Sequence, residues 1–106
     1  MSDIEIAWAA GLFEGEGTIT SAKRPNGKRH LRLALGSTDE DVVRRFHAAV
    51  GVGSVGGPYG PYVEGRKPHW QWHSACRKAN QALDLLLPHL GERRVARAEE
   101  VRSLVG

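Results

Sequence analysis

The chain of 106 residues contains a single cysteine, Cys76, so it can form neither an internal disulfide nor a cysteine-rich zinc site. It has no apolar run of membrane-spanning length, and its opening residues lack the pattern of a secretory signal. These absences argue against membrane and disulfide-stabilised secreted proteins. We therefore expect an intracellular, cytoplasmic protein that has no membrane partner.

Basic residues are absent from the first 22 positions, whose charged residues are Asp3, Glu5, Glu14 and Glu16. Residues 23–36, in contrast, contain five basic residues and no acid: Lys23, Arg24, Lys28, Arg29 and Arg32. The net charge of the whole chain is only +3. An acidic segment beside basic ones suits a polyanion held around a cation site, although ordinary solvated charge has the same composition.

Local patterns predict one α+β domain, residues 1–106, with the element order α-β-β-α-β-β-α-α. Two hairpins joined by a helix indicate an antiparallel four-stranded sheet with the helices on one face. Serine and threonine residues are expected to cap the first three helices, Ser2 in a capping box with Glu5, then Thr38 and Ser74. The expected ranges are helix 3–13, strands 17–24 and 28–36, helix 39–50, strands 51–59 and 69–74, and helices 75–87 and 92–105.

Alternation in two strands predicts which side chains enter the core. Leu31, Leu33 and Leu35 should face inward, leaving a basic outer face. By volume, Trp70 and Trp72 should enter the core and turn the intervening polar residues outward. The opposite parity, with both indoles outside, is the alternative. Two histidines of this strand, His69 and His73, lie too far apart in extended chain to chelate zinc easily.

The segment Ile6 to Thr20, IAWAAGLFEGEGTIT, carries the main functional signal. Small residues recur every fourth position at Ala7, Gly11 and Gly15, a spacing that lets two helix backbones approach closely. The alternative is that this stripe packs on the chain's own sheet. If two such helices meet, the acids at their ends also meet, and they repel unless divalent cations lie between them. Paired Mg²⁺ sites of this kind support phosphodiester cleavage.

Residues 10–17, AGLFEGEG, resemble the LAGLIDADG motif of homing endonucleases position by position, with acids at both acidic places. The resemblance extends over nearly the whole chain, through the aromatic strand HWQWHS and the later segment LLLPHLGERR. It implies the family fold and a site-specific, metal-dependent double-strand DNA endonuclease. Because one motif is present, the chain is similar to the members that act as homodimers on near-palindromic sites.

The resemblance also assigns roles to individual residues. Glu16 matches the catalytic metal-binding acid, with Gly15 beside it at the Mg²⁺ site. Glu14 matches the first acid, for which a capping or solvated role is favoured over direct ligation. Four residues match the dimer contact: Ala7, Gly11, Glu14 and Gly15. The exposed sheet face would bind double-stranded DNA through Thr18, Thr20, Ala22, Arg24, Lys28, His30, Arg32, His69, Gln71 and His73.

Two departures from the family pattern bear on activity. Arg93 stands where the family usually has a lysine, and as a catalytic residue it could stabilise phosphate charge but not act as a base. A glutamine common at the end of the second strand is absent. A DNA- or RNA-binding protein on the same scaffold, a maturase or regulator without nuclease activity, is therefore the first alternative. A plain dimerisation domain with no affinity for DNA is the second.

No small-molecule cofactor is expected beyond the metal. The protein should associate with nucleoid, phage or host DNA. The sequence leaves open whether the reading frame lies in an intron, in an intein or free-standing.

Overall fold

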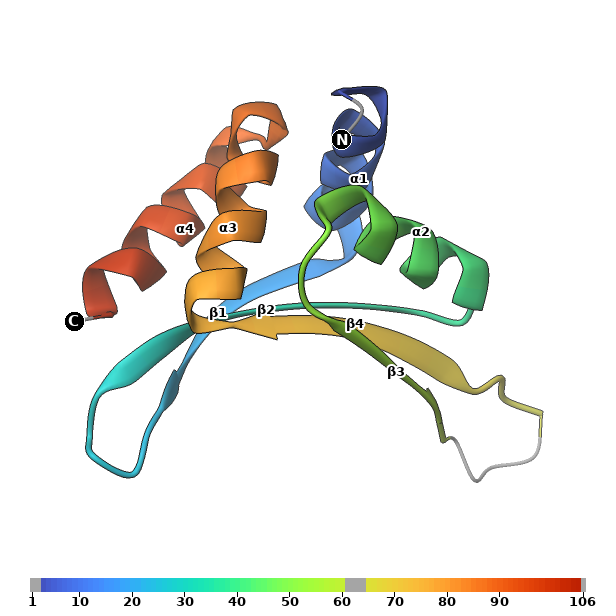
Figure 1. The fold of residues 1–106 in the computed structure, drawn as a ribbon, viewed down its shortest axis with the longest axis horizontal. Helices are drawn as coiled ribbons and strands as arrows, with labels where there is room; N and C mark the ends of the chain where they lie inside the picture. Colours follow the sequence, from blue (N-terminus) through green and yellow to red (C-terminus); the bar gives the residue numbers. More distant parts are fainter. Residues whose placement is uncertain (1–2, 61–64, 106) are drawn as a thin grey trace.

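The computed structural model describes residues 3–60 and 65–105, and Figure 1 shows the course of the chain. Its elements follow the predicted order α-β-β-α-β-β-α-α, with one short 3-10 turn before the last helix. They are α1 Asp3–Glu16, β1 Gly17–Lys23, β2 Arg29–Ser37, α2 Glu40–Val50, β3 Ser54–Tyr59, β4 His69–Ala75, α3 Cys76–Leu86, the turn η1 Leu87–His89 and α4 Glu92–Leu104.

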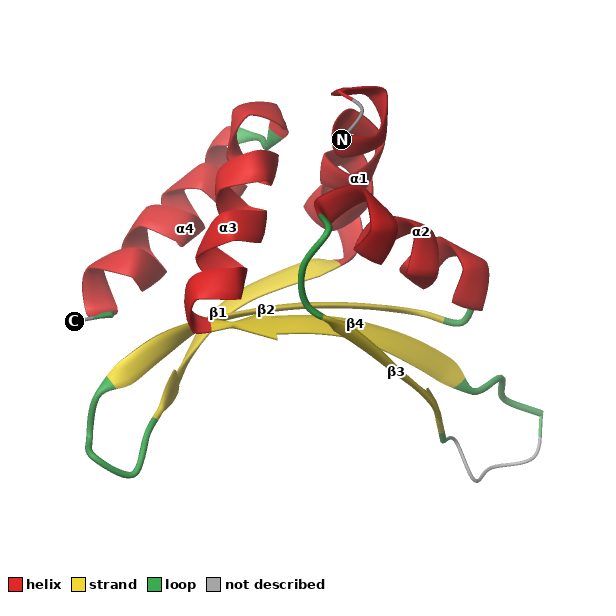
Figure 2. Cartoon of the chain, viewed as in Figure 1, coloured by secondary structure: helices red, strands yellow, loops and turns green. Residues whose placement is uncertain are grey.

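The strands form one antiparallel sheet in the order β1-β2-β4-β3. All four helices lie on one face of this sheet, as Figure 2 shows, so the predicted α+β architecture is confirmed. The two hairpins bend away from the helices at opposite ends of the molecule (Figure 1). The face opposite the helices is therefore concave, and we call it the open sheet face.

The predicted alternation of the strands is confirmed. Leu31, Leu33 and Leu35 are buried beneath the helices. Trp72 is fully buried and donates its indole N–H to the carbonyl oxygen of Val52 at 2.9 Å. Trp70 is partly buried against the same core, so both tryptophans face inward as expected.

Aromatic contacts join the sheet to the two helices above it. The ring of Phe46 on α2 lies 4.8 Å from that of Trp72 and 6.1 Å from that of Phe13 on α1. Arg45 further ties α2 to α1, because it donates two hydrogen bonds to Glu5 and stacks 3.9 Å over the Trp8 ring. The hydrogen bond from Arg45 lowers the pKa of the Glu5 carboxyl. The end of α1 is thus held on a rigid base.

Three predicted helix boundaries are wrong. Helix α1 runs on to Glu16 instead of ending near Phe13, so both motif acids belong to its last turn. Helix α2 begins at Glu40 with Asp39 as N-cap, because the Ser37 hydroxyl accepts the Asp39 N–H and delays the helix beyond Thr38.

Ser74 does not cap α3, because pairing with β2 extends β4 through Ala75. Its side chain instead faces the core opposite Leu33. The predicted cap Ser2 lies outside the described residues, as do positions 61–64 of the predicted connection. The Glu5 carboxylate is occupied by Arg45.

The end of α2 at Gly51 is as predicted, since Gly51 adopts the left-handed conformation with φ 76°. Within residues 3–60 and 65–105, no helix combines the length and the apolar character needed to cross a membrane.

Gly17, the last residue of the motif, leaves room for a core aromatic ring. A Cβ atom at this position would lie 2.3 Å from the Phe13 ring. We expect Gly17→Ala to lower the free energy of unfolding by about 1–3 kcal/mol, because the buried ring must move. Urea denaturation measures this change. Adding Phe13→Leu should recover part of the loss, and a Gly17→Ala protein as stable as the wild type would contradict the assignment.

Candidate DNA interface and acidic site

The two motif acids have different surroundings. Glu14 is turned toward the start of α4, where the backbone N–H of Gly91, the N-cap residue, donates to its Oε1 at 2.5 Å. A carboxylate at a helix N-terminus is stabilised by the positive end of the helix dipole. The favoured capping role of Glu14 is confirmed, although the capped helix is α4 and not its own.

Glu16 is exposed and has no hydrogen bond or ion pair within the described part of the chain. It lies in the last turn of α1, whose carbonyl groups lack partners within the helix because the chain turns into β1 at Gly17. A free carboxylate beside the carbonyl of Gly15 offers oxygen ligands of the kind that Mg²⁺ takes. In residues 3–60 and 65–105, no three acidic, histidine or cysteine side chains gather closely enough to hold a metal ion. One chain therefore supplies part of a metal site at most.

The stripe of small residues on α1 faces away from the chain's own sheet. Ala7, Gly11 and Gly15 are exposed, and a Cβ atom built on either glycine meets nothing within 4 Å. The alternative that the stripe packs on its own sheet is therefore wrong. Glycine inside a helix costs about 1 kcal/mol relative to alanine. The single chain gives no steric reason for that cost, whereas close approach of a second helix does.

Ile4 extends this stripe and was not identified from the sequence. It lies one turn before Ala7 on α1, and 78% of its surface is exposed. Helices that are apolar on all sides are typical of buried positions. The i, i+3 spacing of Ile4 and Ala7 was the available signal.

Two adjacent arginines at the start of α4 have different exposures. The side chain of Arg94 is 13% exposed and donates from Nε to the Glu14 carbonyl oxygen at 3.1 Å. The side chain of Arg93 is 77% exposed, with Nη2 3.9 Å from the Glu14 carboxylate. Arg94 thus fastens the end of α1 to α4. Arg93 reaches the same end of α1 but remains open to solvent.

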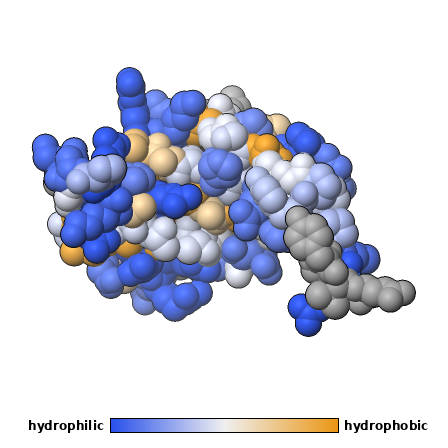
Figure 3. Space-filling view, turned by 90° about the horizontal axis from the view of Figure 1, so that it is seen from below, coloured by the Kyte–Doolittle hydropathy of each residue, from blue (hydrophilic) through white to orange (hydrophobic). Residues whose placement is uncertain are grey.

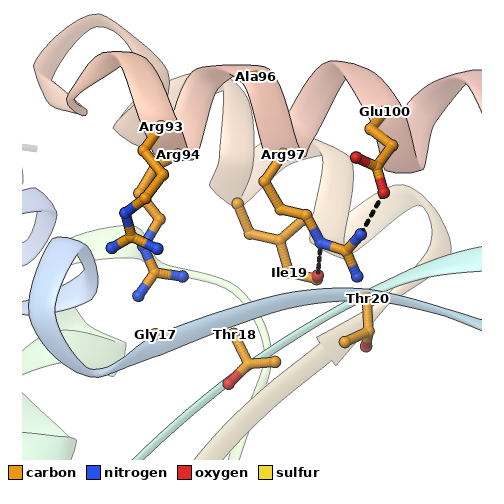
Figure 4. Close-up of a pocket in the computed structure, with 9 residues that line it drawn as sticks. All are labelled: Gly17, Thr18, Ile19, Thr20, Arg93, Arg94, Ala96, Arg97 and Glu100. Atoms are coloured by element: carbon orange, nitrogen blue, oxygen red, sulfur yellow. Dashed lines mark hydrogen bonds and ion pairs between the residues drawn. The ribbon is translucent and has the colours of Figure 1, made fainter.

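A groove of about 430 Å³ runs from these arginines along the contact between α4 and β1. Figure 4 shows Arg93, Arg94 and Arg97 extending from α4 toward the strand that carries Thr18 and Thr20. Arg97 was missed by the sequence reasoning, although its spacing of four residues from Arg93 was a signal. It donates to the carbonyl of Ile19 at 3.0 Å and to Glu100 at 2.6 Å, and so holds the edge strand against α4.

The open sheet face carries most of the predicted DNA-binding residues in cross-strand rows. The rows join Ala22 to His30, Thr20 to Arg32, Thr18 to Ala34 and His73, and Tyr59 to His69, with Gln71 between the last two. Figure 3 views this face directly and shows hydrophilic residues gathered toward the β1–β2 hairpin, with scattered apolar ones between. The structure thus brings these side chains together on one surface.

Arg24 and Lys28 lie just beyond the strand ends, where the Arg24 N–H donates to the Lys28 carbonyl at 2.7 Å. Contrary to expectation, Arg24 does not stand free on the open sheet face. Its guanidinium donates to the sulfur of Cys76 at the start of α3.

The charged residues divide into two groups. Every ion pair in the described ranges uses an arginine of α2 or α4. The basic residues of β2, of the β1–β2 turn and of the start of α3 have no carboxylate partner in these ranges. Unpaired cations beside an open concave face favour a polyanionic partner.

Comparison of the sequence with family models and with curated proteins finds no match. Solved structures do match. The homing endonuclease I-CvuI, in complex with its target, aligns with a TM-score of 0.71 and 17% identity over 96% of this chain and 68% of its own. The chain has the LAGLIDADG homing-endonuclease fold.

Two further structures carry the same fold. The homing endonuclease I-TnaI aligns with a TM-score of 0.67 and 14% identity over 92% of this chain and 69% of its own. The LAGLIDADG meganuclease I-AabMI, bound to uncleaved DNA, aligns with a TM-score of 0.69 and 15% identity over 92% of this chain. The present chain covers only 34% of I-AabMI. The fold to which the sequence motif pointed is confirmed.

Proposed function

We propose that two copies of this chain form a metal-dependent endonuclease that cuts both strands of DNA at a palindromic or near-palindromic site. The observation that carries this proposal is the exposed stripe of Ala7, Gly11 and Gly15, which ends at the unpartnered carboxylate of Glu16. Nothing in the single subunit uses either feature. Both acquire a purpose when a second α1 packs against the first.

A two-fold axis between the α1 helices accounts for the arrangement of the charges. It brings one Glu16 from each subunit to the junction, and it places the two open sheet faces side by side along a duplex. Two such carboxylates repel, and divalent cations relieve the repulsion. I-CvuI has been crystallised with its target in the presence of Ca and, on another target, in the presence of Mg with the DNA not cleaved.

In this dimer, Glu16 and the carbonyl of Gly15 would hold Mg²⁺. A bound Mg²⁺ supplies Lewis acidity, which stabilises both the attacking water and the leaving oxygen of the phosphodiester. The open sheet face would hold the duplex and fix the position of the scissile phosphate. Arg93, exposed beside the end of α1, would neutralise charge that builds up on that phosphate.

The exposures of the two arginines lead to a prediction. Arg93→Ala should lower the single-turnover cleavage rate by roughly 10- to 1000-fold, because a cation near the reacting phosphate is lost, and it should leave the unfolding midpoint unchanged. Arg93→Lys should retain more activity than Arg93→Ala, because it keeps the charge. Cleavage assays at saturating Mg²⁺ and protein measure the rates.

Arg94→Ala serves as the contrast. It should lower the unfolding midpoint, because a mostly buried hydrogen bond to Glu14 is lost. Equal cleavage by Arg93→Ala and the wild type would remove Arg93 from the reaction.

The overall proposal is tested by selecting bound and cut sequences from a random duplex library. The expected result is a two-fold symmetric site that is cut on both strands only when Mg²⁺ is present. Binding of a selected site without nicking under any divalent metal would instead favour the maturase or regulator. Absence of DNA binding at low salt would favour the plain dimerisation domain.

A further inference from the structure

A basic pocket lies at one end of the molecule, away from Glu16. It opens between the β1–β2 hairpin, the start of α3 and the C-terminal end of α4, which Figure 1 shows on the same side of the fold. Its volume is about 440 Å³. We call it the hairpin pocket, and the residues that define it here are Arg24, Lys28, Arg29, His30, Cys76 and Arg77.

The hairpin pocket concentrates positive charge without compensation. Four of its lining residues are arginine or lysine, and no aspartate or glutamate lines it. Their side-chain hydrogen bonds within the described residues go to neutral atoms: Arg24 donates to Cys76 Sγ, and Arg29 donates to the Ser21 hydroxyl at 2.9 Å. Like charges held around one cavity repel each other. An anion in the cavity removes that repulsion.

The start of α3 adds to the positive field. Its first turn contains Arg77 and Lys78 and no acid, and the N-cap residue Ala75 provides no side-chain hydrogen bond. Basic residues at a helix N-terminus oppose the helix dipole, so this arrangement is unfavourable in the absence of an anion. The backbone N–H groups of the first turn need partners, and the oxygens of an anion can serve.

One residue connects this pocket to the open sheet face. His30 lines the pocket and also pairs with Ala22 in the outermost row of that face. Its Nδ1 atom is buried and has no hydrogen-bond partner in the described part of the chain. A duplex lying on the open sheet face therefore has its backbone within reach of the pocket at the hairpin end.

We propose that the hairpin pocket binds a phosphate group, and that its occupant is a backbone phosphodiester of the DNA held by the open sheet face. This deepens the proposed function and rests on it only for the source of the phosphate. Arg24, Arg29 and Arg77 contact the backbone here and read no base. The pocket therefore contributes affinity equally to all sequences.

Two neighbouring cations give a matched pair of variants. Arg77 lines the pocket, whereas Lys78 is exposed in the same helical turn and does not line it. The affinity of each protein for a duplex is measured over a range of salt concentrations. Arg77→Gln should lower the slope of log K against log[salt] by about 0.9, the value for one phosphate contact, on cognate and random duplexes alike. Lys78→Gln should leave the slope unchanged.

Other results would overturn the proposal. Equal slopes for the wild type and Arg77→Gln would show that no backbone phosphate occupies the pocket. An Arg77→Gln effect confined to one DNA sequence would make Arg77 a base contact instead. Lys28→Gln repeats the test at a second, exposed lining residue, so that one misfolded variant cannot decide the outcome.

A titration without DNA separates this proposal from the proposed function. Inorganic phosphate is added to the free protein, and the side-chain NMR signals of His30 and the arginines are followed. Saturable shifts at the hairpin pocket that Arg77→Gln removes would support the phosphate chemistry, even if the protein cut no DNA. Absence of such shifts would overturn it, even if the protein cut DNA. Saturation by phosphate together with an unchanged DNA salt slope would assign the pocket to a free anion and overturn the assignment to the DNA backbone.

Discussion

Glu16→Gln is expected to abolish cleavage, by on the order of 1000-fold or more, while leaving the fold and the affinity for DNA in place. Glutamine keeps the shape of the side chain but removes the negative charge that holds the metal. Glu16 is exposed and touches no partner in the described residues, so its replacement should alter the free energy of unfolding by less than about 0.5 kcal/mol. Single-turnover cleavage in Mg²⁺ and binding in EDTA measure the two effects.

Glu14→Gln provides the matched control, because it makes the same chemical change two positions earlier. It weakens the cap on α4 and should cost about 1 kcal/mol of stability, with a smaller loss of cleavage. In EDTA, Glu16→Gln should also dimerise more tightly than the wild type, because two repelling carboxylates are gone. A Glu16→Gln protein that still cuts at the wild-type rate would show that the metal is held elsewhere.

The strand faces could be predicted from the sequence because side-chain direction alternates along any strand. Three leucines at every second position of β2 fix its register against β1 and β4, and a slip of one residue would expose all of them. Trp72 follows the same rule, since only the interior has room for its ring next to Phe46. These patterns depend only on residues close together in sequence.

The helix starts were less predictable because local capping signals compete with longer-range pairing. Ser74 has the side chain of a good N-cap, yet hydrogen bonding to β2 continues through Ala75 and keeps Ser74 in the strand. Thr38 was superseded by an equally local bond, from the Asp39 N–H to the Ser37 hydroxyl. A serine or threonine before a helix therefore indicates a cap only when no neighbour offers a better partner.

The candidate site was predicted in part. The motif resemblance singled out Glu16 and the glycines, and the structure adds that none of these residues is used within the single chain. The partners of Glu14 were not predictable, because Gly91 lies 77 positions away and contributes a backbone N–H that no residue type announces. The same applies to Arg24, whose contact with Cys76 depends on how the hairpin bends toward α3.

Gly11→Leu is expected to convert the dimer to a monomer without harming the fold of the subunit. In the single chain, a side chain at Gly11 enters open space, and leucine favours helix by nearly 1 kcal/mol relative to glycine. Between two packed helices, the same side chain would push the backbones apart. The subunit should therefore unfold at the same or a higher urea concentration. Its sedimentation coefficient should fall to that of a monomer.

The loss of the dimer should also change how DNA is bound. A dimer gains affinity for a palindromic site from two half-sites at once, an advantage of roughly 100-fold or more that a monomer loses. Gly11→Leu should therefore bind full sites and isolated half-sites with similar affinity. Glu99→Leu, which places the same side chain on the exposed surface of α4, should remain dimeric. If Gly11→Leu dimerised as tightly as the wild type, the subunits would meet elsewhere, and Glu16 would have no symmetric partner with which to share a metal.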